Sequence, residues 1–500
     1  MELAHTLKDL SLAEGSENSS GANSVIRVLS QTRQRFVAEE SVKPSLLKTT
    51  LELLQGRELR WLFPEWSSDF RAAYVELVGC FTEYAALPVC DSDSGVLPAS
   101  SYEQIPPKAE AVGSVLLALT AQLGEAVRSS DSAVSGTGRA LLRALGPTLC
   151  VFSITHLQLH PWTSEVSRTC ALKLLNSTVR ATGSGSLLEL LCGKETDGDQ
   201  TGMLGPILDT LQPELTKDIW KRNQAVKHVF SWVLVQVRRP WLADYLEKVF
   251  PPSLLISDDY RTDNKILGVH CLHHIVLNVP AADLRQFNRA QVLYHALFNH
   301  LYTSDAPLIQ VVLPCMVDLL SVLEKPHVQS GPPRKPNHFD DVFRLILTHM
   351  EMEHKLALRR IYASSLLLFI EKMGIGIARH LKRLERVIVG YLEVSDGPEE
   401  KARLSTLEVL ERTIKTAWPR MECRMDVLSK SLLRFLVDIS SEPLAPELRE
   451  ELMTRASRCL LLLDHCSQGK LLVLLKDVDS SCVSDSVLKC IQNLGAAQGV

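Results

Sequence analysis

The feature that most constrains the fold is a regular succession of apolar stripes at helical spacing, clearest from Thr262 onward. Within each stretch apolar residues return every three or four positions, and strictly alternating runs are hard to find. This period predicts amphipathic α-helices and essentially no β-strands. We expect helices at about 262–279, 287–302, 305–324, 337–351, 354–372, 376–394, 397–416, 420–440, 445–466 and from 469 onward.

These helices group in pairs whose starts recur roughly every forty-odd residues, which is the period of HEAT-like helical hairpins. A single hairpin cannot bury its apolar stripe, whereas stacked hairpins bury theirs against one another. We therefore predict an all-α chain that folds as an α-solenoid of HEAT/armadillo-like hairpin repeats. The expected pairs include 354–372 with 376–394 and 397–416 with 420–440.

Polar, Gly/Ser-rich or Pro-rich segments divide the chain into regions. We expect a disordered leader at 1–24 and a divergent helical region of looser spacing at 25–220. The strongest repeats fill 221–496. Solvated loops are predicted at 90–107, 193–202 and 325–337.

A local signal marks the start of the helix expected at 397–416. Gly397 is placed to act as its N-cap and Pro398 as its first residue, because proline has no N–H to leave unpaired there. Glu399 and Glu400 would then face the positive end of the helix dipole.

The composition argues for a packed, reduced protein without a strong charge preference. Hydrophobic residues make up 46% of the chain and charged residues 22%, which suffices for a packed fold. The net charge of -4 gives no global attraction to nucleic acid or to an anionic membrane. None of the 12 cysteines forms a C-x-x-C pair, so we expect reduced thiols in the cytoplasm or nucleus.

Neither a secretory signal nor a membrane span is expected. Residues 1–23 lack a basic start followed by an apolar run. We expect no apolar stretch long enough to cross a bilayer, since even 311–320 contains Pro314 and Asp318.

The segment that most resembles a metal-binding or catalytic motif runs from His270 to His274. These two imidazoles are four residues apart and share one face of a helix, a common spacing for two metal ligands. Closed zinc sites take four ligands, and no H-E-x-x-H motif, neighbouring carboxylate or cysteine pair completes one in sequence. We favour a buried central helix with hydrogen-bonded imidazoles over a metal-dependent hydrolase. No catalytic residue, cofactor or metal ligand is predicted.

Two other segments, one acidic and one basic, leave alternative interpretations open. Asp258 and Asp259 fit an acid–base or metal pair, a helix-entry loop before Thr262, or a contact with a protein partner. The basic ridge of the helix at 376–394 fits a solvated, ion-paired face and a partner contact equally. Its residues are Arg379, Lys382, Arg383 and Arg386.

Large aromatic residues stand beside arginine between Trp232 and Trp241. Such residues are favoured at interface hot spots, but tryptophan is equally at home in a helical core. We interpret Trp232 as a core residue and Trp241, which follows Arg239, as partly exposed.

Nine strings over about residues 220–420, in order and at consistent spacing, resemble the signature of the Tel-two-interacting protein two family. They are HVFSW (228–232), RPWL (239–242), LISDDY (255–260), NKILGVHCLHH (264–274), NRAQVLYH (288–295), RLILTHM (344–350), HLKRLERVI (380–388), GYLEV (390–394) and DGPEE (396–400). Upstream, FSITH (152–156) and PWT (161–163) are thinner matches.

The resemblance implies a subunit of the Triple T complex, a heterotrimer with Tel two and Tel-two-interacting protein one. It implies a co-chaperone adaptor that helps phosphatidylinositol-three-kinase-related kinases mature, together with the ninety-kilodalton heat-shock chaperone. These kinases serve DNA-damage, nutrient and telomere signalling. The family works in cytoplasm and nucleus, has no catalytic residues to carry over, and implies neither a nucleic-acid nor a membrane partner.

Surface chemistry within the resembling region suggests where a partner binds. We predict aromatic anchors and orienting charges at Arg239, Trp241, Asp258, Asp259, Tyr260, Arg289, Tyr294, Arg383 and Arg386. A HEAT-repeat transport receptor or phosphatase scaffold is the alternative function, and a metal-dependent hydrolase centred on His270 and His274 is a more distant one.

Overall fold

The computed structural model describes residues 21–64, 66–92, 95–193, 202–324, 335–475, 487–490 and 492. Throughout these ranges the regular elements are helices and no strand occurs, so the predicted all-α class is confirmed. Most of the predicted leader and of the loops at 193–202 and 325–337 lies outside the described residues. Residues 21–24 already belong to the first helix that the structure describes, α2 (Gly21–Ala38).

The chain divides into two compact units between Ile256 and Ser257. The predicted region boundary at residue 220 therefore falls inside the first unit. The first unit contains α2, α3 (Lys43–Gly56), α4 (Leu59–Leu62), α5 (Ser68–Tyr84), α6 (Ile105–Val127), α7 (Ser132–Leu157), α8 (Glu165–Ala181), α9 (Leu187–Cys192), α10 (Leu204–Leu211), α11 (Gln224–Gln236) and most of α12 (Leu246–Ser257).

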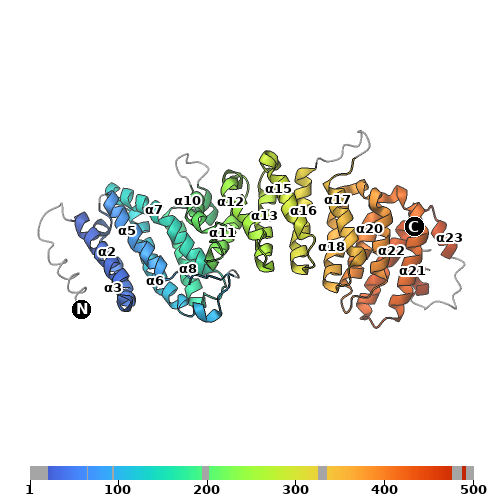
Figure 1. The fold of residues 1–500 in the computed structure, drawn as a ribbon, viewed down its shortest axis with the longest axis horizontal. Helices are drawn as coiled ribbons and strands as arrows, with labels where there is room; N and C mark the ends of the chain where they lie inside the picture. Colours follow the sequence, from blue (N-terminus) through green and yellow to red (C-terminus); the bar gives the residue numbers. More distant parts are fainter. Residues whose placement is uncertain are drawn as a thin grey trace. The chain divides into compact units, whose positions relative to one another are not determined.

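Helices of the first unit stack in two rows (Figure 1). One row runs through α2, α5 and α7, and the other through α3, α6 and α8. Aromatic rings fill the core between them, with Phe36 against Phe81 and Phe70 against Tyr74 at centroid separations of 4.9 and 5.1 Å. Stacked hairpins thus extend into the region where the looser sequence spacing had not predicted clean repeats.

The second unit carries the regular repeats predicted from the sequence. Its helices agree closely with the expected ranges and are α13 (Thr262–Asn278), α14 (Ala281–Arg285), α15 (Arg289–His300), α16 (Ala306–Leu323), α17 (His338–Met352), α18 (Leu356–Met373), α19 (Leu381–Leu392), α20 (Lys401–Ala417), α21 (Met425–Ser441), α22 (Pro446–Cys466) and α23 (Lys470–Leu475). The α-solenoid prediction is confirmed.

The hairpins of this unit are paired one helix out of step with our prediction. Close sequential neighbours are α15 with α16, α17 with α18, α19 with α20, and α21 with α22. One row then runs from α16 through α18 and α20 to α22, and the other through α17, α19 and α21. Periodicity locates helices but not their partners, because either grouping leaves the same spacing between pair starts.

The predicted start of α20 is wrong. The helix begins at Lys401, and Glu400 precedes it with a left-handed φ of +50°. The N-terminal amides of Ala402 and Arg403 donate to the side chain of Asp396, at 2.9 and 3.3 Å. A carboxylate therefore caps this helix in place of the expected Gly397.

Among the residues that the structure describes, four helical segments are long and apolar enough to cross a membrane by length and composition, so the expectation that there are none is wrong. The share of each apolar window buried inside the protein ranges from 44% to 61%. Packing between stacked hairpins uses this apolar surface. The segments are Ala99–Val127, Ser132–Leu157, Ala306–Leu323 and Leu356–Leu392.

Candidate protein-interaction surfaces

One edge of the second unit is formed by the connections that precede α13, α16, α18, α20 and α22. Its successive connections contact each other: Thr262 donates a hydrogen bond to Asp305, and the rings of Tyr302 and His349 lie 6.1 Å apart. We call this surface the arginine-braced edge. It comprises residues 258–261, 301–305, 353–355, 393–400 and 442–445, with the helix ends beside them.

Arginines at the start of α18 tie this edge to the next hairpin. The Arg359 guanidinium lies 3.8 Å from the ring centroid of Tyr391 and donates to the carbonyl of Gly390 at 3.3 Å. Arg360 Nε donates to the Asp396 carboxylate at 2.8 Å. These contacts fix the connection before α20 to the start of α18.

A buried ionic cluster continues the bracing at α20. Asp396 and Glu400 are fully buried, and Glu400 accepts hydrogen bonds from the Asp396 amide at 3.1 Å and from Ser395 Oγ at 2.6 Å. Arg403, which is 2% exposed, donates two hydrogen bonds to Glu442 at 2.7 and 3.0 Å. Burying these charges requires that they stay paired, which makes this part of the edge rigid.

Large apolar side chains project from the same edge into solvent. Tyr260, Tyr302 and Met352 are exposed, and Leu356 and Val394 are also more than one-third exposed. Exposed aromatic and methionine side chains on a rigid base are typical of the centre of a protein–protein interface. The edge is therefore our candidate docking surface in the second unit.

The predicted acidic segment lies on this edge as a helix-entry loop before Thr262. Asp258 and Tyr260 are exposed and available to a partner. Asp259 is buried and accepts a hydrogen bond from Asn264 Nδ2. The structure thus separates two acids that looked equivalent in the sequence.

The two candidates on α15 differ in accessibility. Arg289 is half-buried and lies over the ring of Phe287, 5.2 Å from its centroid. Tyr294 is only 6% exposed, and its ring lies 4.6 Å from that of His338. Burial raises the pKa of Tyr294 to about 12. Tyr294 supports the packing of α15 and offers a partner little surface.

The predicted basic ridge spans a 3-10 helix (Gly374–His380) and α19, and its arginines pair with acidic residues of α17. Arg383 and Arg386 both pair with Glu351 of α17, at 3.1 and 3.4 Å. Arg379 approaches Asp340 at 3.9 Å. Each of these half-exposed ion pairs contributes little stability. Two predicted contact residues, Arg383 and Arg386, are therefore already paired within the second unit.

Arg239 and Trp241 belong to the first unit, whereas the other candidates belong to the second. Arg239 is exposed, and Trp241 is half-buried, as predicted, at the start of a short 3-10 helix (Trp241–Tyr245). Trp232 is also half-buried and lines a pocket of about 460 Å³. The interpretation of Trp232 as a core residue is therefore wrong.

The helix α13 is buried along its apolar side, but the expectation of a buried imidazole is wrong at His270, which is exposed. His273 Nε2 lies 2.9 Å from the Asp318 carboxylate, and Asn278 donates to the carbonyl of His274. Cys271 is buried, and burial raises the pKa of its thiol to about 12. Within the described part of the chain, no three His, Cys, Asp or Glu side chains are grouped to hold a metal ion.

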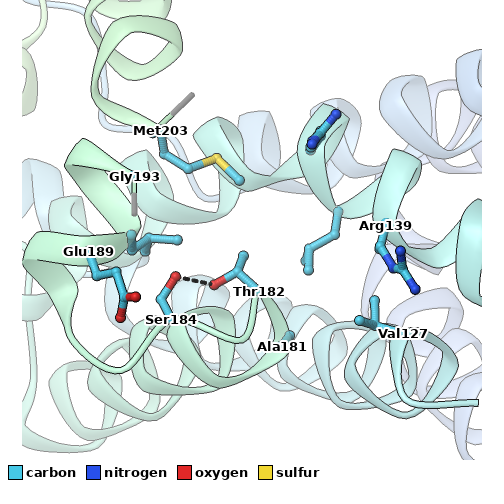
Figure 2. Close-up of a pocket in the computed structure, with 12 residues that line it drawn as sticks. Val127, Arg139, Ala181, Thr182, Ser184, Glu189, Gly193 and Met203 are labelled. Atoms are coloured by element: carbon cyan, nitrogen blue, oxygen red, sulfur yellow. Dashed lines mark hydrogen bonds between the residues drawn. The ribbon is translucent and has the colours of Figure 1, made fainter. Parts of the chain in front are cut away.

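A pocket of about 340 Å³ lies among α7, α8, α9 and α10 in the first unit (Figure 2). Figure 2 shows Glu189 at one end and Arg139 at the other, with Thr182 and Ser184 between them, joined by a hydrogen bond of 3.0 Å. Ser184 follows the end of α8. No sequence motif indicates this pocket, because its lining residues come from separate elements.

Stacked helical hairpins define a helical-repeat protein, a class in which successive repeats build extended surfaces. A family model described as the Tti2 family matches residues 205–399. The chain is 44% identical to TELO2-interacting protein 2 of Homo sapiens over 497 residues, which are 98% of this chain and 96% of that relative. The chain belongs to the Tti2 family.

Other relatives and solved structures were also found. TELO2-interacting protein 2 of Rattus norvegicus is 49% identical over 401 residues, which are 79% of this chain and 78% of that protein. A Kap95p–RanGDP structure matches with a TM-score of 0.45 and 12% identity, over 100% of this chain and 68% of that one. Yeast importin-beta (Kap95p) matches with a TM-score of 0.40 and 13% identity, over 98% of this chain and 68% of that one.

Proposed function

We propose that this chain is a non-catalytic scaffold subunit of the Triple T complex, where it assembles with TELO2 and Tel-two-interacting protein one. One observation carries the proposal: 44% identity to a protein named for interaction with TELO2, over 98% of this chain. Repeat proteins bind through surfaces built by many successive repeats. A likeness along nearly the whole chain therefore bears on binding more directly than one confined to a fragment.

Within that complex the chain acts as a co-chaperone adaptor. It supports the maturation and stability of phosphatidylinositol-three-kinase-related kinases in DNA-damage, nutrient and telomere signalling. The kinases and the ninety-kilodalton heat-shock chaperone are indirect partners. Family membership is what supports this role.

The adaptor works in cytoplasm and nucleus. Every cysteine that the described residues include is a free thiol, as expected of a protein from a reducing compartment. Imaging of the tagged full chain in native cells tests this, and accumulation in a secretory compartment would contradict it.

The partner protein binds to the arginine-braced edge of the second unit. Because buried ion pairs already hold the edge in place, a partner does not have to order it, and less of the binding free energy is lost to entropy. Exposed Tyr260, Tyr302 and Met352 then supply apolar area, while Asp258 contributes to orientation.

Affinity purification of the full chain from native cells, followed by mass spectrometry, tests the proposal. TELO2 and Tel-two-interacting protein one are expected to dominate the recovered proteins. Recovery of import machinery without chaperone components would contradict the proposal and favour a transport receptor. Stoichiometric zinc in the purified protein would instead revive a metal-dependent enzyme.

Variants on the edge test its part in docking. Tyr260→Ala and Asp258→Ala are suited to this because both side chains are exposed and their loss leaves the core intact. Weaker co-purification of TELO2 is expected from each. Unchanged binding by both variants would remove this segment from the interface.

A further inference from the structure

Phe287 stands out in the second unit, in the connection between α14 and α15. Its φ is +52°, in the left-handed region, and its side chain is 75% exposed. A bulky residue is a genuine outlier in this region, because its Cβ crowds the following carbonyl. Neither backbone preference nor burial within the chain favours a phenylalanine at this position.

The backbone on both sides of this ring is held firmly. Leu284 is fully buried, and Arg285 Nε donates to the carbonyl of Val322 at 2.7 Å. After the ring, Arg289 donates to the carbonyl of Asp283 at 3.4 Å. The strained conformation therefore belongs to a braced connection between packed helices.

The surroundings of the ring indicate the chemistry of its partner. The guanidinium of Arg289, two residues after Phe287, lies 5.2 Å from the ring centroid. Arg285, two residues before Phe287, carries a second positive charge. Aromatic and arginine side chains are the types most enriched at interface hot spots. An apolar pocket bounded by acidic side chains is complementary to this pair of features.

We propose that Phe287 is an anchor residue that inserts into an apolar pocket with an acidic rim on the protein partner of this chain. The inference rests on the proposed function, because the partner used to test it is the TELO2-containing complex. Strained backbone persists only where the surrounding structure holds it, and such positions cluster at ligand-binding and active sites. Because the connection that carries the ring is already braced, capture of the ring orders little additional chain.

The test measures binding of the full chain to the assembled pair of TELO2 and Tel-two-interacting protein one, together with the melting temperature. Phe287→Gly removes the ring and suits the left-handed backbone. We expect binding on the order of 30-fold weaker, the loss typical of a hot spot, with the melting temperature unchanged or raised. Phe287→Asn, which also tolerates this backbone, is expected to do the same.

Two further variants separate the anchor from a general effect of exposed rings. Phe287→Tyr retains the aromatic face and is expected to bind within about twofold of wild type. Trp418→Ala removes another exposed ring, 63% accessible, from the same unit but outside the arginine-braced edge. Its effect on affinity is expected to be clearly smaller than that of Phe287→Gly.

The outcomes distinguish this inference from the function on which it rests. Wild-type affinity in folded Phe287→Gly overturns the anchor and leaves the proposed function intact. An equal loss from Trp418→Ala also overturns it, since the strained position would then have no special role. If the wild-type chain itself fails to bind the pair, the proposed function has failed.

Discussion

Asp396, Glu400 and Arg403 are charged side chains held almost entirely out of water. Each carboxylate accepts backbone hydrogen bonds, and Arg403 reaches both Glu400 and Glu442, at 3.5 and 2.7 Å. A buried ion pair of this kind adds little net stability, but removing one partner leaves an uncompensated charge. The cluster therefore specifies the position of the connection before α20.

Replacing Arg403 tests that reasoning. Arg403→Met keeps most of the side-chain volume but leaves Glu400 buried without its cation, so we expect the free energy of unfolding to fall by about 3–5 kcal/mol. Arg434→Met removes a 69% exposed arginine from pairs with Glu393 and Asp438 and should cost less than about 1 kcal/mol. Urea unfolding followed by circular dichroism measures both, and equal losses would contradict the account.

Buried histidines make the first unit sensitive to acid. His156 is 2% exposed, and burial lowers its pKa from 6.5 to about 4. Burial, helped by the nearby charges of His160 and Lys227, lowers the pKa of His228 to about 3. Between pH 6.5 and about 4 the unfolded chain therefore binds protons that the folded chain does not. Stability is fully present above this range and falls as the pH decreases through it.

The histidine contribution is isolated by comparing His156→Gln with wild type. From about pH 7 to 4.5, the unfolding free energy of the wild type should fall by about 2 kcal/mol more than that of the variant, because glutamine does not titrate. Urea titrations of both proteins at the two pH values measure the difference. Parallel pH dependence would show that His156 is not the group responsible.

At the scale of elements, close helix packing depends on single glycines. A Cβ built on Gly268 of α13 would lie 2.2 Å from the backbone nitrogen of Ser257, whereas one built on Gly390 of α19 would meet nothing within 4 Å. Both glycines lie inside helices, where alanine is otherwise the better helix former. They therefore form a matched pair.

Alanine at these two positions should have opposite effects. We expect Gly268→Ala to lower the unfolding free energy by about 1–3 kcal/mol or more, because backbone must move to admit the methyl group. Gly390→Ala should raise it by up to about 1 kcal/mol through helix propensity. Thermal and urea unfolding measure both changes, and destabilisation by Gly390→Ala would contradict the packing described here.

Helices were the part of the fold most readily predicted from sequence. Amphipathic periodicity located α13 and α16 to within a residue or two. The predicted start of α20 was wrong, because Gly397-Pro398 is the stronger local signal for a helix start. The cap instead comes from the side chain of Asp396, five residues before Lys401. Hairpin pairing was also missed, since period alone does not choose between adjacent partners.

The candidate surface was only partly predictable. Residue type singled out Tyr260 and Asp258, which proved exposed, and also Tyr294, which is buried. Exposure depends on which face of a helix meets its neighbours, and a single sequence does not give that. Phe287 was missed because left-handed backbone at a phenylalanine has no signature in residue type.

At the scale of the molecule, each unit is a stack of hairpins with its own continuous core. In the second unit, the row from α16 to α22 buries apolar side chains such as Leu313, Phe369 and Leu410 completely. Contacts of this kind run between neighbouring repeats, so stability is distributed along the stack. The same arrangement leaves long edges free for a partner.

Reconstitution tests the central claim most directly. The purified full chain is mixed with TELO2 and Tel-two-interacting protein one, and the mass of the assembly is measured by size-exclusion chromatography with light scattering. One stable species that contains all three proteins is expected. Elution of the folded chain as a separate species, at concentrations where the other two associate, would contradict it.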